Sequence, residues 1–265
     1  MSEFNFEPSH YVPFRDKKVL EKMRKITRKD FENHPNPNLN VNVMSRDDMS
    51  WAFVTDIFFR IKDHMEAGKK LVMIIPQPWP NYARIADMLN KCKVNCKNLY
   101  TFNMDEYADQ DGNVAPETWP YGFTHAMKKY FYSKLDPKLR PPEKQMVGLC
   151  NENLKDYGKM ISDLGGADIC YSGPGWTGHI AFTEPDAPEI PQDLEEFKKW
   201  GPGIVTLSPF TLAQNSLHGS FGSSGDIAAV PPKAATIGPA QYLEAKEVIS
   251  SYGITIRGTT SLASR

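Results

Sequence analysis

The sequence contains no long run of apolar residues and no excess of charge of either sign. Its longest apolar run lies at 71–76, far short of the roughly 20 residues that cross a bilayer as a helix. Basic residues number 31 and acidic residues 32, for a net charge of -1, so the chain has no basic field to attract nucleic acid. The N-terminus lacks the basic-then-apolar pattern of a signal sequence. These absences exclude nucleic-acid and membrane partners from our expectations and favour a cytoplasmic location.

Cysteine is also scarce, with four residues scattered along the chain. This number is too small for a disulfide framework in a chain of 265 residues, so we expect reduced thiols. Cys92 and Cys96 are four residues apart in a helix-like stretch and could offer two thiolates to a metal. No second Cys/His pair has a suitable spacing, so we expect structural roles for them and no metal site.

The first 39 residues are polar, mixed in charge and interrupted by prolines. We interpret residues 1–39 as an N-terminal extension with one helix, because 17–31 has an amphipathic pattern. Residues 40–44 alternate polar and apolar side chains, which predicts a short edge strand. Ser45 is then placed as the N-cap of a helix over 51–67, which Gly68 ends.

Strand-like and helix-like segments alternate along the rest of the chain. Strands are predicted at 69–75, 98–104, 167–172 and 247–256, and further helices between 80 and about 92, at 122–135, at 152–164 and from 257 onward. Because parallel strands need crossover connections, residues 40–265 are predicted to form one α/β domain. We expect a Rossmann-like, doubly wound, mainly parallel sheet with helices on both faces. The last helical pattern stops after one or two turns, so the chain is also expected to be a fragment.

Three unusual segments, 76–80, 105–107 and 173–179, follow predicted strands, where such sheets bind ligands. Asp105 and Glu106 are adjacent carboxylates after an apolar strand. One of them could act as a general base, or both could cap a helix or face solvent. His179 follows a glycine-rich turn and could reach a ligand or be structural. Glu184, five residues on, could orient its imidazole.

Two long motifs carry a resemblance to a known family. Residues 101–107 (TFNMDEY) and 173–185 (GPGWTGHIAFTEP) resemble the strand-end motif and the second motif of glucosamine-6-phosphate deaminases. Residues 232–248 resemble a later part of the same family. The resemblance implies a deaminase/isomerase that acts on a sugar or sugar phosphate, works without a cofactor and forms a homo-oligomer.

The resemblance also assigns roles within the site. It implies that Asp105 is the base that moves a proton between C2 and C1 of the open sugar, and that His179, assisted by Glu184, opens the ring. Both tasks need groups with a pKa near neutrality. The expected substrate-binding residues are Gln77, Trp79, Glu106, Gly175, Trp176, Thr177, Gly178, Thr259 and Thr260.

The departures from the family pattern fall on substrate-binding positions. Residues 77–80 (QPWP) replace a glycine-rich phosphate loop, and Thr177 replaces an aspartate that works with the histidine. Leu217 stands where the family has a phosphate-binding arginine, and Thr260 or Ser261 where it has a lysine. Three interpretations stay open: an isomerase/deaminase with an altered phosphate site, a non-catalytic sugar-binding regulator, or a 6-phosphogluconolactonase-like hydrolase. The forms of the two motifs favour the deaminase over the lactonase.

Overall fold

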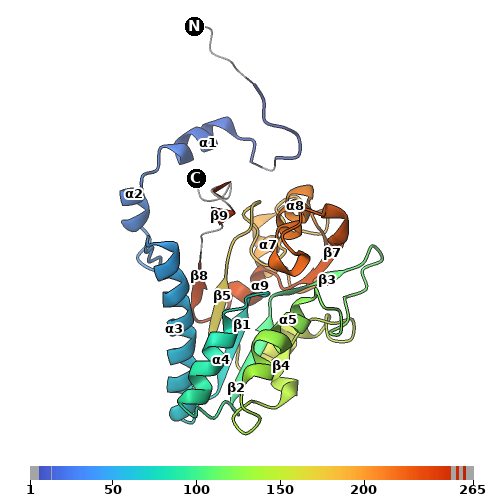
Figure 1. Cartoon of the computed structure of the whole chain (residues 1–265). Coiled ribbons are helices and arrows are strands. Elements are labelled where there is room, and N and C mark those ends of the chain that lie inside the picture. The colour runs from blue at the N-terminus through green and yellow to red at the C-terminus, as the bar shows by residue number, and fades with distance from the viewer. Residues whose placement is uncertain (1–5, 13, 252–254, 257–258, 261–265) are drawn as a thin grey trace.

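A computed structural model describes residues 6–12, 14–251, 255–256 and 259–260. Its centre is a parallel five-stranded sheet in the order β4-β2-β1-β5-β8 (Figure 1). The strands are β1 (Leu71–Ile75), β2 (Leu99–Asn103), β4 (Met146–Val147), β5 (Ile169–Ser172) and β8 (Val248–Ser250). Every residue of the middle strand, β1, is buried, as a strand covered on both faces requires.

Alternate residues of β1 pack into two different cores. Leu71, Met73 and Ile75 lie in a cluster with residues of α3 (Arg46–Glu66), α4 (Tyr82–Lys91) and α5 (Phe123–Tyr130). Val72 and Ile74 lie in a second cluster with residues of α6 (Tyr157–Asp163) and α9 (Pro239–Leu243). This period of two follows from the geometry of a strand. The predicted doubly wound arrangement, with helices on both faces, is confirmed.

A second, smaller sheet was not predicted. Strands β3 (Asp105–Ala108), β7 (Lys233–Thr236) and β6 (Gly203–Thr206) form it in the order β3-β7-β6 with antiparallel pairing. The chain passes from the large sheet to the small one at Met104, whose N–H donates to the Ile75 carbonyl (3.3 Å) and whose carbonyl accepts from the Ile237 N–H (2.8 Å). Asp105 therefore begins a new strand, where the sequence pattern indicated only the end of an old one.

The small sheet has a core of its own, rich in aromatic residues. Tyr107 lies at its centre, with the rings of Phe123, Phe182 and Phe221 each within 6 Å of it. Helices α7 (Leu194–Lys199) and α8 (Pro209–Ser216) each add a partly buried residue to this core. The core holds α8 close to β3, which matters for the site described below.

Helix α3 has the predicted N-cap and the predicted stop, although it begins at Arg46 where the prediction covered 51–67. Ser45 is its N-cap and accepts the N–H of Asp48 at 3.1 Å, and Gly68 beyond its end has a φ of +66°. Glycine adopts that conformation without steric cost. Among the residues that the structure describes, neither α3 nor any other helix is long and apolar enough to cross a membrane.

The N-terminal extension contains two helices, where one was predicted. Helix α1 covers Lys17–Arg24 and α2 covers Arg28–Glu32, and both lie outside the two-sheet body (Figure 1). Thr27 breaks the expected helix because it forms a capping box with Asp30, each side chain accepting the other's backbone N–H. Residues 40–44 form no strand. They are exposed apart from half-buried Val41 and lie beside no partner strand, so their alternation has no sheet to join.

The predicted strand at 247–256 and the helix after it are described only in part. Strand β8 accounts for Val248–Ser250. The pairs Thr255–Ile256 (β9) and Thr259–Thr260 (β10) form an antiparallel ladder, so the latter is strand and not helix. The rest of the predicted helix lies outside the described residues. Short 3-10 helices complete the described structure at Tyr132–Lys134, Glu143–Gln145, Gly219–Phe221 and Ile227–Ala229.

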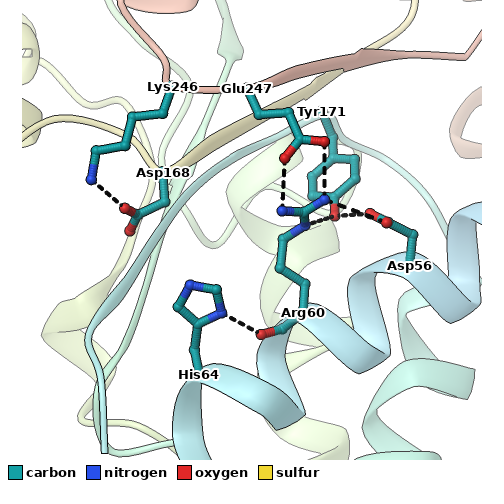
Figure 2. Close-up of polar contacts among 7 residues, drawn as sticks. All are labelled: Asp56, Arg60, His64, Asp168, Tyr171, Lys246 and Glu247. Carbon is teal, nitrogen blue, oxygen red and sulfur yellow. Dashed lines mark hydrogen bonds and ion pairs between the residues drawn. The ribbon is translucent and has the colours of Figure 1, made fainter. Parts of the chain in front are cut away.

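Arg60 of α3 ties this helix to the edge of the large sheet (Figure 2). Its guanidinium donates two hydrogen bonds to the carboxylate of Glu247, at 2.9 and 3.1 Å, and a third to the Tyr171 hydroxyl at 3.1 Å. The Tyr171 hydroxyl in turn donates to Asp56. A planar guanidinium suits such a bidentate contact, so the edge strand β8 is fixed against α3 although few of its own side chains are buried.

Candidate active site

A cavity of about 140 Å³ lies beyond the carboxyl ends of the central strands. Four of the predicted site residues line it: Gln77 after β1, Asp105 after β2, and Gly175 and His179 after β5. Loops that follow neighbouring parallel strands meet at one edge of the sheet, which explains why these distant residues converge. The structure thus brings the two predicted proton-transfer groups, Asp105 and His179, to the wall of one cavity.

Asp105 is the carboxylate that faces the cavity. Its side chain is buried, with 7% of the residue exposed, and receives no hydrogen bond from any described residue. Burial, with a smaller contribution from the charge of Glu106, raises the pKa of Asp105 well above its ordinary value. A carboxyl group in this state can hold or release a proton closer to neutral pH than a solvated aspartate.

Glu106 is not among the residues that line the cavity, and its carboxylate bonds to backbone N–H groups. Its carboxylate accepts the backbone N–H groups of Phe123 (2.8 Å), Thr124 (2.7 Å) and Tyr107 (3.0 Å). The first two are at the start of α5, where N–H groups have no partner within the helix. Burial raises the pKa of Glu106, and these backbone bonds oppose that rise. Glu106 thus caps a helix, one of the roles that its position had left open, while its substrate-binding role stays a prediction.

His179 is held by a hydroxyl relay. Its Nδ1 lies 2.7 Å from Thr177 Oγ1, which donates to Glu184 Oε2 at 2.9 Å. A carboxylate only accepts hydrogen bonds, so the single proton of the Thr177 hydroxyl goes to Glu184. Nδ1 must then carry the proton that it shares with Thr177. This leaves Nε2 of a neutral His179 as an acceptor on the side of Gly175 and the cavity.

Glu184 is the buried anchor of this relay, with no exposed surface. Burial alone would raise its pKa, but contacts with His179, Thr211 and Thr177 outweigh burial and lower the pKa. The backbone N–H of Ser208, the N-cap of α8, also reaches Glu184 Oε1 at 3.3 Å. The direct distance from His179 Nδ1 to Glu184 Oε2 is 3.5 Å, which is long for a hydrogen bond. The Thr177 hydroxyl therefore bridges the two groups.

The glycine-rich loop is shaped around the imidazole. A Cβ at Gly175 would lie 2.2 Å from His179 Nε2, which only glycine avoids. Gly178 has a φ of +83° and turns the chain back so that the Gly175 N–H reaches the His179 carbonyl at 2.9 Å. Trp176 donates its backbone N–H to Gln214 at 2.6 Å. Trp176, Thr177 and Gly178 thus position His179 and do not themselves line the cavity.

A second cavity of about 270 Å³ adjoins the first and shares Pro76, Gln77 and Gly173 with it. Trp79 forms part of its wall, and its indole packs edge-on against the rings of Phe53 and Tyr82 at 5.0 Å. The Gln77 amide lies at the junction of the two cavities.

Helix α8 contributes three cavity residues that the sequence analysis did not assign to the site: Gln214, Asn215 and, just beyond the helix, His218. Burial, together with the charge of His179, lowers the pKa of His218 to about 4, so it is neutral at pH 7. A signal was present in the sequence. The polar residues of 211–216 are buried on one helix, an arrangement that is rare without a ligand or a hydrogen-bond network.

Thr259 and Thr260 belong to β10, and their side chains are outside the described residues. Across the described part of the chain, no group of three or more His, Cys, Asp or Glu side chains could hold a metal ion.

Comparison with known proteins identifies relatives of this fold and site. No protein-family model matches the chain. It is 32% identical to a glucosamine-6-phosphate deaminase of Phocaeicola vulgatus over 179 residues, which are 65% of this chain and 59% of that protein. A glucosamine-6-phosphate deaminase of Caenorhabditis elegans is 29% identical over 197 residues, 72% of this chain and 66% of that protein. The chain spans 59% and 61% of the length of the relatives from Phocaeicola vulgatus and Fusobacterium nucleatum.

Solved structures show the same fold. A monomeric glucosamine-6-phosphate deaminase superposes with a TM-score of 0.63 at 21% identity, covering 79% of this chain and 80% of that one. A 6-phosphogluconolactonase from Thermotoga maritima gives a TM-score of 0.52 at 11% identity, covering 80% and 98%. The chain therefore has the α/β fold that these deaminases and lactonases share. Within that fold, the chain is similar in sequence to curated glucosamine-6-phosphate deaminases over 65–72% of its own length.

Proposed function

We propose that the chain is an amino-sugar isomerase/deaminase that releases ammonia and whose phosphate site is altered. The observation that carries the proposal is the presence of Asp105 and His179 on the wall of one cavity, the first with a raised pKa and the second with an acceptor nitrogen available. An aldose-to-ketose conversion needs one base beside C2 and a separate acid/base at the ring oxygen.

Ring opening is the step assigned to His179. Its unprotonated Nε2 takes the proton from the C1 hydroxyl of the pyranose and delivers it to the ring oxygen as the C1–O5 bond breaks. The Nδ1–H stays bonded to Thr177, and the negative charge of Glu184 stabilises the transient imidazolium through that hydroxyl. The open sugar then has an aldehyde at C1 and an amine at C2.

Isomerisation is assigned to Asp105. Its carboxylate removes the proton from C2 while the C1 oxygen gains a proton from the protonated C2 amine, which gives an enolamine. Asp105 then returns the C2 proton to C1, leaving a protonated imine at C2. Water adds to the imine, and ammonia leaves as the C2 carbonyl of the ketose forms. A raised pKa suits both halves of this transfer, since the same group must accept the proton and give it back.

Release of ammonia from glucosamine and from glucosamine 6-phosphate tests the proposal. We expect Asp105→Asn to lower kcat by about 10²–10⁴-fold with little change in the dissociation constant of the sugar. Asp111→Asn, a control at an exposed loop position, should leave kcat unchanged. A wild-type chain that binds an amino sugar without releasing ammonia would instead support a sugar-binding regulator. Hydrolysis of 6-phosphogluconolactone that survives Asp105→Asn would support a lactonase.

A further inference from the structure

The cavity of about 270 Å³ beside the catalytic one has no assigned role. It adjoins the catalytic cavity at Pro76, Gln77 and Gly173, which line both. A single sugar with its C1–C2 end near Asp105 would extend its other end past Gln77 into this second space. The chemistry of the second cavity therefore decides what that end of the substrate carries.

Gln77 presents an unused hydrogen-bonding pair at the junction. Only 9% of the residue is exposed, and neither Nε2 nor Oε1 has a hydrogen-bond partner among the described residues. Buried polar atoms are normally paired, so an orphaned donor and an orphaned acceptor on one side chain indicate a ligand that supplies both complements. A hydroxyl group donates and accepts, whereas a phosphate dianion only accepts and has no proton to donate to Oε1.

The turn that forms the cavity wall offers few groups to an anion. Pro76, Pro78 and Pro80 have no N–H to donate. The first N–H groups of α4 are also used, because Tyr82 donates to the Trp79 carbonyl and Ala83 to the Pro80 carbonyl, each at 3.1 Å. A helix N-terminus binds anions through such N–H groups only when they are free.

The side chains described around this cavity do not replace those missing donors. No lysine, arginine or histidine is among the described residues that line the second cavity. Its polar side chains are the Gln77 amide and the hydroxyls of Ser50, Ser172 and Ser251, and its apolar wall includes Trp79 and Phe53. Neutral hydroxyls, one amide and aromatic rings form a surface that suits an uncharged sugar carbon with its hydroxyl group.

We propose that this cavity binds the uncharged C5–C6 end of the sugar, so that the substrate is an amino sugar without a 6-phosphate. The inference rests on the proposed deaminase function and adds the substrate class to it. It sets this chain apart from the relatives named after glucosamine 6-phosphate.

Binding of unreactive ligands tests the inference separately from catalysis. Glucosamine reduced at C1 cannot isomerise, and it can be prepared with and without a 6-phosphate. In calorimetric titrations of the full chain, we expect the unphosphorylated form to bind at least tenfold tighter. Gln77→Arg should shift this ratio at least tenfold toward the phosphorylated form, while Gln110→Arg, the same change at an exposed position, should leave the ratio unaltered.

Gln77→Glu is a second test of the inference if the Gln77→Arg variant does not fold. It keeps the shape, removes the donor and adds a negative charge, so it should weaken binding of the phosphorylated ligand further than that of the neutral one. The inference is overturned if the wild-type chain binds the phosphorylated ligand more tightly, if it binds neither ligand, or if both Gln77 variants leave the ratio unchanged. Tight neutral binding without ammonia release from glucosamine would instead count against the deaminase function and leave the binding assignment standing.

Discussion

Replacing Thr177 with valine tests the relay between His179 and Glu184. Valine keeps the shape of threonine but lacks the hydroxyl, so the change deletes the contacts of 2.7 Å to His179 and 2.9 Å to Glu184. A hydrogen bond to a charged group contributes about 1.5–3 kcal/mol. We expect the free energy of unfolding at pH 7, measured by urea denaturation, to fall by about that amount.

The loss should depend on pH with a definite sign. Contacts with His179, Thr211 and Thr177 lower the pKa of Glu184 below its ordinary 4.5 in spite of its burial. A carboxyl group with a lowered folded-state pKa stabilises the fold above its unfolded-state pKa, and this stability is lost as the pH falls through the folded-state value. Removing the Thr177 hydroxyl raises that folded-state pKa. The difference in unfolding free energy between wild type and Thr177→Val should therefore be largest near neutral pH and shrink below about pH 4.5.

Ammonia release gives a second measure of the same change. A loss of about 1.5–3 kcal/mol in holding the imidazolium corresponds to roughly 10- to 100-fold in rate. Thr183→Val is the matched control, because the Thr183 hydroxyl is buried in the same loop and donates to the Ile237 carbonyl, at 3.4 Å, and not to His179 or Glu184. Thr177→Ser should restore much of the activity. If Thr177→Val and Thr183→Val behaved alike in unfolding and in ammonia release, the relay would have no energetic role.

Three further changes test other parts of the structure. Gly175→Ala would place a Cβ 2.2 Å from His179 Nε2, so kcat for ammonia release should fall at least ~100-fold. Gly219→Ala should have no effect on kcat, because a Cβ at Gly219 would have no neighbour within 4 Å. Burial and the charge of Glu106 raise the pKa of Asp105, so the charged Asp105 carboxylate destabilises the fold once the pH exceeds the unfolded-state pKa. Asp105→Asn should therefore raise the free energy of unfolding, measured in urea titrations, by at least ~1 kcal/mol at pH 7 and by less at pH 4. Arg60→Met removes a partly buried ion pair and should lower the free energy of unfolding by about 1–3 kcal/mol, as seen in thermal denaturation.

Local sequence signals predicted the elements that depend on local physics. The Ser45 cap, the Gly68 stop and the apolar run at 71–75 each fix an element through neighbouring residues, and the structure has all three. The capping box at Thr27 is equally local, and it was overlooked because the amphipathic pattern continues through it. Residues 40–44 show the opposite case, since alternation predicts a strand only where a partner strand exists.

Long-range contacts account for the parts of the site that sequence patterns did not predict. Asp105 and Glu106 are adjacent and chemically alike, and only the position of α5 assigns one to the cavity and the other to a helix cap. His218 reaches the cavity because the small sheet holds α8 near β3, a pairing across more than 100 residues. The role of Thr177 likewise depends on where Glu184 lies. From the sequence, Thr177 indicated only the loss of the family's aspartate charge, whereas in the structure its hydroxyl bridges His179 and Glu184.

The crossing of the chain at Met104 has a mechanical consequence. Its N–H is bonded to the large sheet and its carbonyl to the small one, so the residue that follows, Asp105, stands at the joint between two rigid layers. Any sliding of one sheet over the other would change the gap between Asp105 and His179, because the relay of His179 is anchored to α8 on the side of the small sheet. The gap between Asp105 and His179 and the fit between the two sheets are therefore linked. The exchange rates of the Met104 and Ile237 amide protons would report on both.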